Sequence, residues 1–182
     1  MTPPTDSRDE ATDTARMKAI LLLTAALAFA VMPFFTPFDG FEPDQFPIPQ
    51  ENPPVQPAGY AFAIWGPIYL WLLAHAVWGV VRRSDAPDWD APRWPLAGSL
   101  VIGAAWLPVA GLSPLWATVM IWAMLGLALV ALIRAARGGE PWLLRGPVGL
   151  YAGWLTAASV VALGLLAAGN GVLAGAVAWA WI

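Results

Sequence analysis

The sequence contains no cysteine and one histidine, and only 12% of its 182 residues are charged. The lack of cysteine excludes disulfides, thiol catalysis and cysteine metal sites, and a single histidine cannot build a histidine-rich metal cluster. Nine basic residues against twelve acidic ones argue against a nucleic-acid partner, because phosphates require a cationic face. Hydrophobic residues make up 59% of the chain, and the mean hydropathy is +0.63. Since soluble domains carry about 25% charged residues, this composition indicates a membrane protein.

Five apolar runs are long enough to cross a bilayer, which takes about 20 residues per helix. They cover residues 19–35, 60–81, 94–112, 114–133 and 147–168. None shows the alternation of a membrane β-barrel, and hydrocarbon offers backbone groups no partner, so we expect helices. The predicted fold class is all-α, a polytopic membrane protein with a five-transmembrane-helix bundle in one domain, residues 17–182. A short apolar C-terminal tail, residues 172–182, follows, and the sequence leaves open whether it begins a sixth helix.

The basic residues predict the orientation of these spans. With five crossings they all fall on one face: Arg8, Arg16, Lys18, Arg82, Arg83, Arg93, Arg134, Arg137 and Arg145. The positive-inside rule makes that face cytoplasmic. We therefore expect a multi-pass protein of a bacterial inner (cytoplasmic) membrane, with its N-terminus in the cytoplasm.

The two polar segments near the N-terminus have separate interpretations. Residues 1–16 are too polar to order alone, which predicts a disordered cytoplasmic end. A cleaved signal peptide at 16–31 is the weaker alternative, because its leader is acidic. The loop at 36–59 is stiffened by seven prolines, which suits a lid over one mouth of the bundle. We favour a plain tether between two helices for the acidic part of this loop, Asp39 to Glu51. For residues 53–60 we favour a lid.

No catalytic set is visible, so the sequence does not predict an enzyme. The spans contain no aspartate or glutamate, and no serine–histidine–acid group or metal-ligand spacing occurs. His75, deep in the second span, is the exception, because an ionisable group there can contact a ligand, ligate a haem iron or take up a proton. The alternative is a structural role, in which a neutral histidine bonds a neighbouring group, and this is the more common case.

Twelve tryptophans are far more than ordinary usage and need an explanation. Some lie near span ends, as in the aromatic belt at a membrane interface: Trp89, Trp94, Trp116, Trp142, Trp179 and Trp181. Other aromatic residues lie at mid-depth: Trp65, Tyr69, Trp106, Trp122, Tyr151 and Trp154. Such rings can line a slot for a flat, largely apolar ligand such as a tetrapyrrole or sterol, or they can fill space between helices. Spacing alone leaves both interpretations open.

Three motifs resemble the TspO/MBR family, the tryptophan-rich sensory proteins related to the mitochondrial translocator protein. Trp65-Gly66-Pro67-Ile68-Tyr69 resembles the family's aromatic-Gly-Pro-aliphatic-aromatic signature, and 57–62 its proline-aromatic approach. Ala105-Trp106-Leu107-Pro108 resembles its Ala-Trp-Ser-Pro stretch. Pro147 with 151–156 resembles its Pro…Tyr-x-x-Trp-x-Ser stretch. The order of the motifs matches over residues 57–168, and the form is that of a divergent bacterial branch.

The chain departs from the family pattern at polar positions. An asparagine usual before the third-span tryptophan is Gly103, and another in the fifth span is replaced around Ala162. No cholesterol-type Leu/Val-Tyr-Lys/Arg pattern ends the fifth helix, which argues against mitochondrial-style sterol recognition.

The resemblance implies a membrane binding, regulatory or transport protein for tetrapyrroles, in stress response or the regulation of photosynthesis. The implied pocket lies beneath the first loop and takes porphyrin, haem or a similar flat ligand, or lipid; no cofactor is required. Its expected ligand-binding residues are Trp65, Tyr69, Trp106, Tyr151 and Trp154, with His75 as a polar contact. The alternative is an accessory or assembly subunit of a larger, photosynthetic membrane complex, whose tryptophans pack on partner helices, lipid or pigment. Small-residue pairs such as Gly149 and Gly153 leave a homodimer open.

Overall fold

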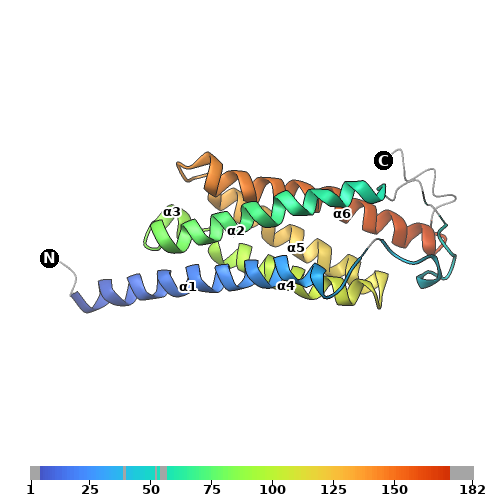
Figure 1. The fold of residues 1–182 in the computed structure, drawn as a ribbon, viewed down its shortest axis with the longest axis horizontal. Helices are drawn as coiled ribbons and strands as arrows, with labels where there is room; N and C mark the ends of the chain where they lie inside the picture. Colours follow the sequence, from blue (N-terminus) through green and yellow to red (C-terminus); the bar gives the residue numbers. More distant parts are fainter. Residues whose placement is uncertain (1–4, 39, 52, 54–56, 173–182) are drawn as a thin grey trace.

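The computed structural model describes residues 5–38, 40–51, 53 and 57–172, which form helices and loops and no strand. Five long helices run along a common axis, and the first loop lies at the end opposite the N-terminus (Figure 1). The long helices are α1 (Thr5–Val31), α2 (Trp65–Arg82), α4 (Arg93–Ala110), α5 (Pro114–Ala135) and α6 (Gly146–Gly169). The shorter ones are η1 (Met32–Phe34), η2 (Pro43–Gln45), η3 (Gly59–Ile64), α3 (Pro87–Asp90) and η4 (Pro141–Arg145). The predicted tail beyond Val172 lies outside the described residues.

Each predicted span corresponds to one long helix, so the all-helical fold is confirmed. Four helical segments in the described part of the chain are long and apolar enough to cross a membrane: Glu10–Phe34, Gly59–Arg82, Pro114–Ala135 and Pro141–Gly169. α4 is not among them. Its 18 residues are long enough, but they include the charged Arg93 and Pro108, which lower the hydropathy of the helix. The count of five crossings therefore stays a prediction.

Local sequence explains where α5 begins and where α6 ends. Ser113 caps α5 by accepting a hydrogen bond from the Trp116 N–H, and Pro114 occupies the first helical position, where no N–H is needed. α6 ends where Gly171 adopts φ +69°, a left-handed conformation. The N–H groups of Gly171 and Val172 then bond the Ala168 and Ala167 carbonyls. This is a Schellman motif, which turns the chain away from the helix axis.

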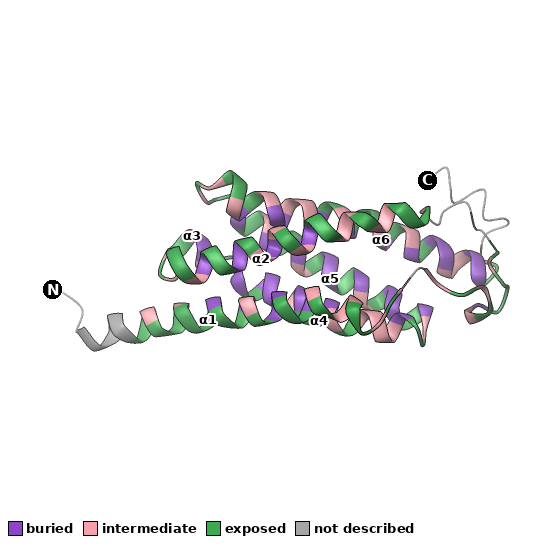
Figure 2. Ribbon diagram, in the orientation of Figure 1, coloured by how far each residue is buried: buried purple, intermediate pink, exposed green. Residues whose placement is uncertain are grey.

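Buried residues lie along the bundle axis, and exposed residues lie on its outside (Figure 2). α1 packs against α2 and α4, α4 against α5, and α5 against α6, whereas α2 and α6 touch much less. α5 presents a row of small buried residues that lets its neighbours approach closely: Ala117, Ala128, Ala131 and Ala135.

The N-terminal segment differs from the expectation of a disordered end, because α1 is helical from Thr5. The membrane part of α1 already supplies a helical nucleus, so extending it costs no new nucleation. The Thr14 hydroxyl bonds the Glu10 carbonyl, and acidic residues near a helix N-terminus favour the helix dipole. Lys18 pairs with Asp90 at 2.8 Å, which joins α1 to α3.

A buried arginine organises the end of the bundle that carries the basic residues. Arg93 is 1% exposed, and its guanidinium donates to Asp90 and to the carbonyls of Ala15, Ser84 and Arg83 at 2.7–3.2 Å. These bonds satisfy carbonyls at the end of α2 and tie α1 and α3 to α4. An ion pair between Arg83 and Glu140 joins the end of α2 to the loop before η4.

Two tryptophans lie where the sequence did not place them. Trp89 was expected in the interfacial belt, yet it is 2% exposed because the unpredicted helix α3 folds it under α2 and η4. Trp122, expected at mid-depth, lies on the outer face of α5 and is 44% exposed. The belt prediction fits Trp94, Trp116 and Trp142, which are 53–75% exposed. The two remaining belt residues, Trp179 and Trp181, lie outside the described residues.

We predict that Arg93→Met destabilises the protein by about 3 kcal/mol, because removing one member of a buried charged network leaves the other groups unpaired. The free energy of unfolding is measured by SDS titration in mixed micelles. Arg137→Met is the matched control, since Arg137 is exposed. Equal stability of the two variants would contradict a structural role for Arg93.

Candidate functional site

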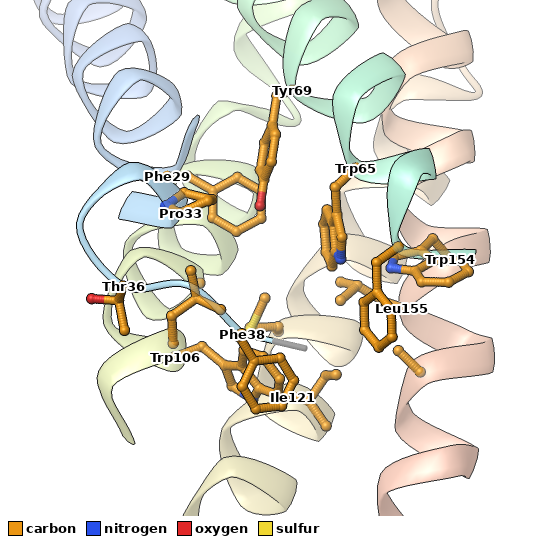
Figure 3. Close-up of a pocket in the computed structure, with 15 residues that line it drawn as sticks. Phe29, Pro33, Thr36, Phe38, Trp65, Tyr69, Trp106, Ile121, Trp154 and Leu155 are labelled. Carbon is orange, nitrogen blue, oxygen red and sulfur yellow. The ribbon is translucent and has the colours of Figure 1, made fainter. Parts of the chain in front are cut away.

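A cavity of about 210 Å³ lies beneath the first loop, enclosed by α1, α2, α4, α5 and α6 (Figure 3). Its wall is mainly aromatic: Phe29, Phe38, Phe62, Trp65, Tyr69, Trp106 and Trp154. A second hollow of about 90 Å³ adjoins it, sharing Phe38, Phe62, Trp106 and Trp154 and extending along α6. Four of the mid-span rings thus converge on one hollow: Trp65, Tyr69, Trp106 and Trp154.

Trp65 and Tyr69 form the α2 wall of the cavity. Their four-residue spacing places them on one helical face, where the rings stack at 5.4 Å with an interplanar angle of 16°. Phe29 of α1 meets both rings edge-on, at 5.7 Å from Trp65 and 5.0 Å from Tyr69. No sequence pattern indicates this role for Phe29, which is one of many apolar residues in its span.

Trp106 and Trp154 close the cavity from α4 and α6. The Trp106 Nε1–H donates to the Ala117 carbonyl at 2.8 Å, which fixes its ring and joins α4 to α5. Trp154 lies opposite and meets Trp65 edge-on at 6.0 Å. Both indoles are oriented by neighbouring helices, so the cavity has preformed aromatic walls.

The described part of the loop between α1 and α2, residues 36–38, 40–51, 53 and 57–59, is here called the lid and covers the mouth. Phe38 lines the cavity and packs edge-on against Trp106 at 5.0 Å. Gln45 Nε2 donates to the Ala110 and Gly111 carbonyls, and the Ile48 N–H donates to the Gly169 carbonyl at 2.9 Å. The interpretation of the acidic part as a plain tether is therefore wrong, because this stretch is fastened to the ends of α4 and α6.

Three residues of the cavity wall carry side-chain donors that have no hydrogen-bond acceptor among the described residues. Trp154 Nε1 is buried and has no partner, and neither Trp65 Nε1 nor the Tyr69 hydroxyl bonds an acceptor in the described part of the chain. An indole N–H can only donate. A molecule in this hollow would satisfy these groups by presenting an acceptor oxygen or nitrogen.

Tyr151 lies one layer away from the cavity and does not line it. It is fully buried under Phe29, with ring centroids 5.7 Å apart. The Ser99 hydroxyl has one proton and donates it to the Met124 carbonyl at 2.8 Å. The Tyr151 hydroxyl is therefore the donor in its 2.9 Å hydrogen bond to Ser99 Oγ. Tyr151 therefore holds α6, α4 and α5 together beneath the site.

His75 lies far from the aromatic hollow, at the level of η4. It is 1% exposed, and its Nδ1 lies 2.7 Å from the Leu143 carbonyl, which can only accept, so Nδ1 is the donor. Its ring stacks on Trp89 at 4.9 Å and 13°. The structure does not place His75 near the other predicted site residues. Its burial and its bond to Leu143 fit the alternative of a hydrogen-bonded core histidine.

Gly103 shows why the family asparagine is absent here. A Cβ at Gly103 would lie 2.6 Å from Phe29 Cε2 and 2.9 Å from Met124 Cε, so a larger residue does not fit. Phe29 thus fills the space that a side chain from α4 would need. An apolar ring replaces a polar amide on the cavity floor.

The family model for TSPO-like proteins matches residues 16–182, nearly the whole chain. The chain belongs to this family. No curated protein and no solved structure gives a match. At the level of the family, membership supports a multi-pass membrane protein that binds or transports tetrapyrrole-related molecules. The TSPO-like motifs around Trp65, Trp106 and Trp154 are the ones that build the cavity wall.

We predict that Gly103→Ala destabilises the TSPO-like chain by about 1–3 kcal/mol, the usual cost of overpacking a core. Phe29→Leu in the same chain should restore most of that loss, since the smaller side chain vacates the space. Unfolding of the two single variants and the double variant in mixed micelles checks this. Additive losses would show that Gly103 and Phe29 do not compete for the same volume.

We predict that His75→Ala lowers stability by about 2–3 kcal/mol, because it opens a cavity and leaves the Leu143 carbonyl without its donor. The affinity of the His75→Ala variant for a ligand of the aromatic hollow should stay within twofold of the affinity of the unmodified chain. A factor of two equals about 0.4 kcal/mol. A tenfold loss of affinity at unchanged stability would instead place His75 in the binding site.

Proposed function

We propose that this TSPO-like protein binds a flat, largely apolar ligand beneath its lid, and that tetrapyrroles such as porphyrin or haem are the favoured class. The observation that carries the proposal is the convergence of Trp65, Trp106 and Trp154 with Tyr69 on one enclosed hollow. Aromatic faces stack well on a planar conjugated ring. The proposed role is binding linked to regulation or transport, without catalysis.

The polar groups of the hollow narrow the chemical class of the ligand. Among the described residues that line the two hollows, tyrosine is the only ionisable one, and the side chains of Trp65, Tyr69 and Trp154 offer hydrogen-bond donors. A ligand with an apolar body and an acceptor edge, such as a carboxylate-bearing porphyrin, complements them. Its acceptor would meet the unpartnered Trp154 Nε1.

The size of the hollow indicates how such a ligand would sit. Binding sites for drug-sized molecules usually measure about 300–1,000 Å³. The main hollow of about 210 Å³ and its neighbour of about 90 Å³ reach only the lower end of that range. A whole tetrapyrrole would therefore join the two hollows and displace Phe38 and Phe62, which stand between them.

The proposed placement has five crossings, with the N-terminus in the cytoplasm of a bacterial inner membrane. α4 has 18 residues, and at 1.5 Å per residue it spans about 27 Å, close to the hydrocarbon thickness of about 30 Å. Its lower hydropathy suits the centre of the bundle, where α1 and α5 cover it. The lid and the cavity mouth then face the extracytoplasmic side.

The accessory-subunit alternative would need the mid-span indoles to point outward. Trp122 does so, but three others line the interior hollow. The exposed belt residues fit membrane lipid as well as a partner helix. A homodimer through small-residue faces and assembly into a larger complex stay predictions.

We predict that protoporphyrin binds the purified protein and that Trp106→Ala combined with Trp154→Ala weakens binding about tenfold or more, since each stacked ring contributes roughly 0.5–1.5 kcal/mol beyond its area. A titration followed by the Soret absorbance of the porphyrin is independent of the number of tryptophans.

Trp122→Ala is the control for this titration, because it removes an indole from the outer face of α5. It should leave affinity unchanged. The proposal fails when the unmodified protein shows no saturable Soret change, or when the control and the double variant bind alike.

A further inference from the structure

The described part of the lid is fastened to the ends of α4 and α6 across the cavity mouth. Three hydrogen bonds fasten it, two from Gln45 Nε2 and one from the Ile48 N–H. Phe46 is 5% exposed and packs directly on Gly169, where a Cβ would collide with its ring. Opening the lid would break these bonds and expose Phe46 to water.

The interface between α2 and α6 is closed near η4. A Cβ at Gly146 would lie 2.6 Å from Trp71 Cζ2, so the indole from α2 rests on the backbone of α6. Trp71 also contacts Trp142 at 6.3 Å. This end of the interface is therefore filled by large rings.

Seven residues further along α6, the same helical face is open. Gly153 lies two turns from Gly146, on the same side of the helix. It is exposed, and a Cβ there would meet nothing within 4 Å. At this level α2 and α6 meet through the edge-on contact of Trp65 with Trp154, and both indoles line the cavity and are half-buried.

Hydrogen bonds hold three other helix interfaces, and the bond from His75 of α2 ends on Leu143 of η4, not on α6. Trp106 bonds α4 to α5, Ser99 bonds α4 to α6, and Ser159 bonds α5 to α6. In the described part of the chain no hydrogen bond joins α2 to α6. α1 and α2 also lack one, but Phe29 fills their interface.

We propose that ligand enters sideways from the bilayer, through the interface between α2 and α6 beside Gly153, and that the Trp65–Trp154 contact is the gate. This inference rests on the proposed function and adds the route by which the ligand reaches the cavity. A flat apolar ligand concentrates in lipid, so a lateral route spares it a passage through water. Parting two rings breaks no hydrogen bond, whereas lifting the lid breaks three.

The test fills the entrance without touching the cavity lining. Gly153→Phe and its small counterpart Gly153→Ala are reconstituted in phosphatidylcholine vesicles and mixed with vesicles loaded with protoporphyrin. Stopped-flow absorbance gives the rates of binding and release. Gly126→Phe is the matched control, because Gly126 of α5 is also exposed with nothing within 4 Å of a Cβ.

We expect Gly153→Phe to slow binding and release together by about tenfold, with an unchanged dissociation constant, because a blocked entrance raises the barrier and not the stability of the complex. Gly153→Ala, Gly126→Phe and Gln45→Ala should keep the unmodified rates. Equal rates for Gly153→Phe and Gly126→Phe would overturn the lateral entrance, as would acceleration by Gln45→Ala. No porphyrin binding by the unmodified chain would overturn the proposed function itself, and the entrance with it.

Discussion

Phe29 of α1 packs on Gly103 of α4 where a Cβ would lie 2.6 Å from its ring. The same ring meets Trp65, Tyr69 and Tyr151 edge-on, so one side chain connects α1, α2, α4 and α6. The van der Waals packing of this ring matters because lipid supplies little driving force for helix association. The aromatic wall above it keeps its shape because its base is fixed.

The bundle has two ends with different chemistry. At the end with the basic residues, Arg93 binds backbone carbonyls and Asp90, and His75 stacks on Trp89 and bonds Leu143. At the lid end, aromatic rings surround empty volume, and few polar bonds cross between helices. A hydrogen-bonded base suits a protein that admits a ligand without unfolding, because it holds the helices together while α2 and α6 part near the lid end.

Hydropathy located four of the long helices within about five residues, since a span must satisfy its backbone internally, but α1 begins at Thr5, 14 residues before the predicted start at residue 19. It did not locate α3, because four residues carry no periodicity, and so Trp89 was assigned to the interface. The family motifs identified the cavity wall at Trp65, Trp106 and Trp154. Phe29 and Phe38 could not be found this way, because their roles depend on a glycine 74 residues later and on a loop conformation that no local pattern encodes.

An experimental structure of the protein saturated with protoporphyrin tests the central claim most directly. The account predicts planar density between Trp65, Trp106 and Trp154, with Phe38 displaced and an acceptor group of the ligand near Trp154 Nε1. Density confined to the outer faces of the helices, with the interior hollow unchanged, would contradict it.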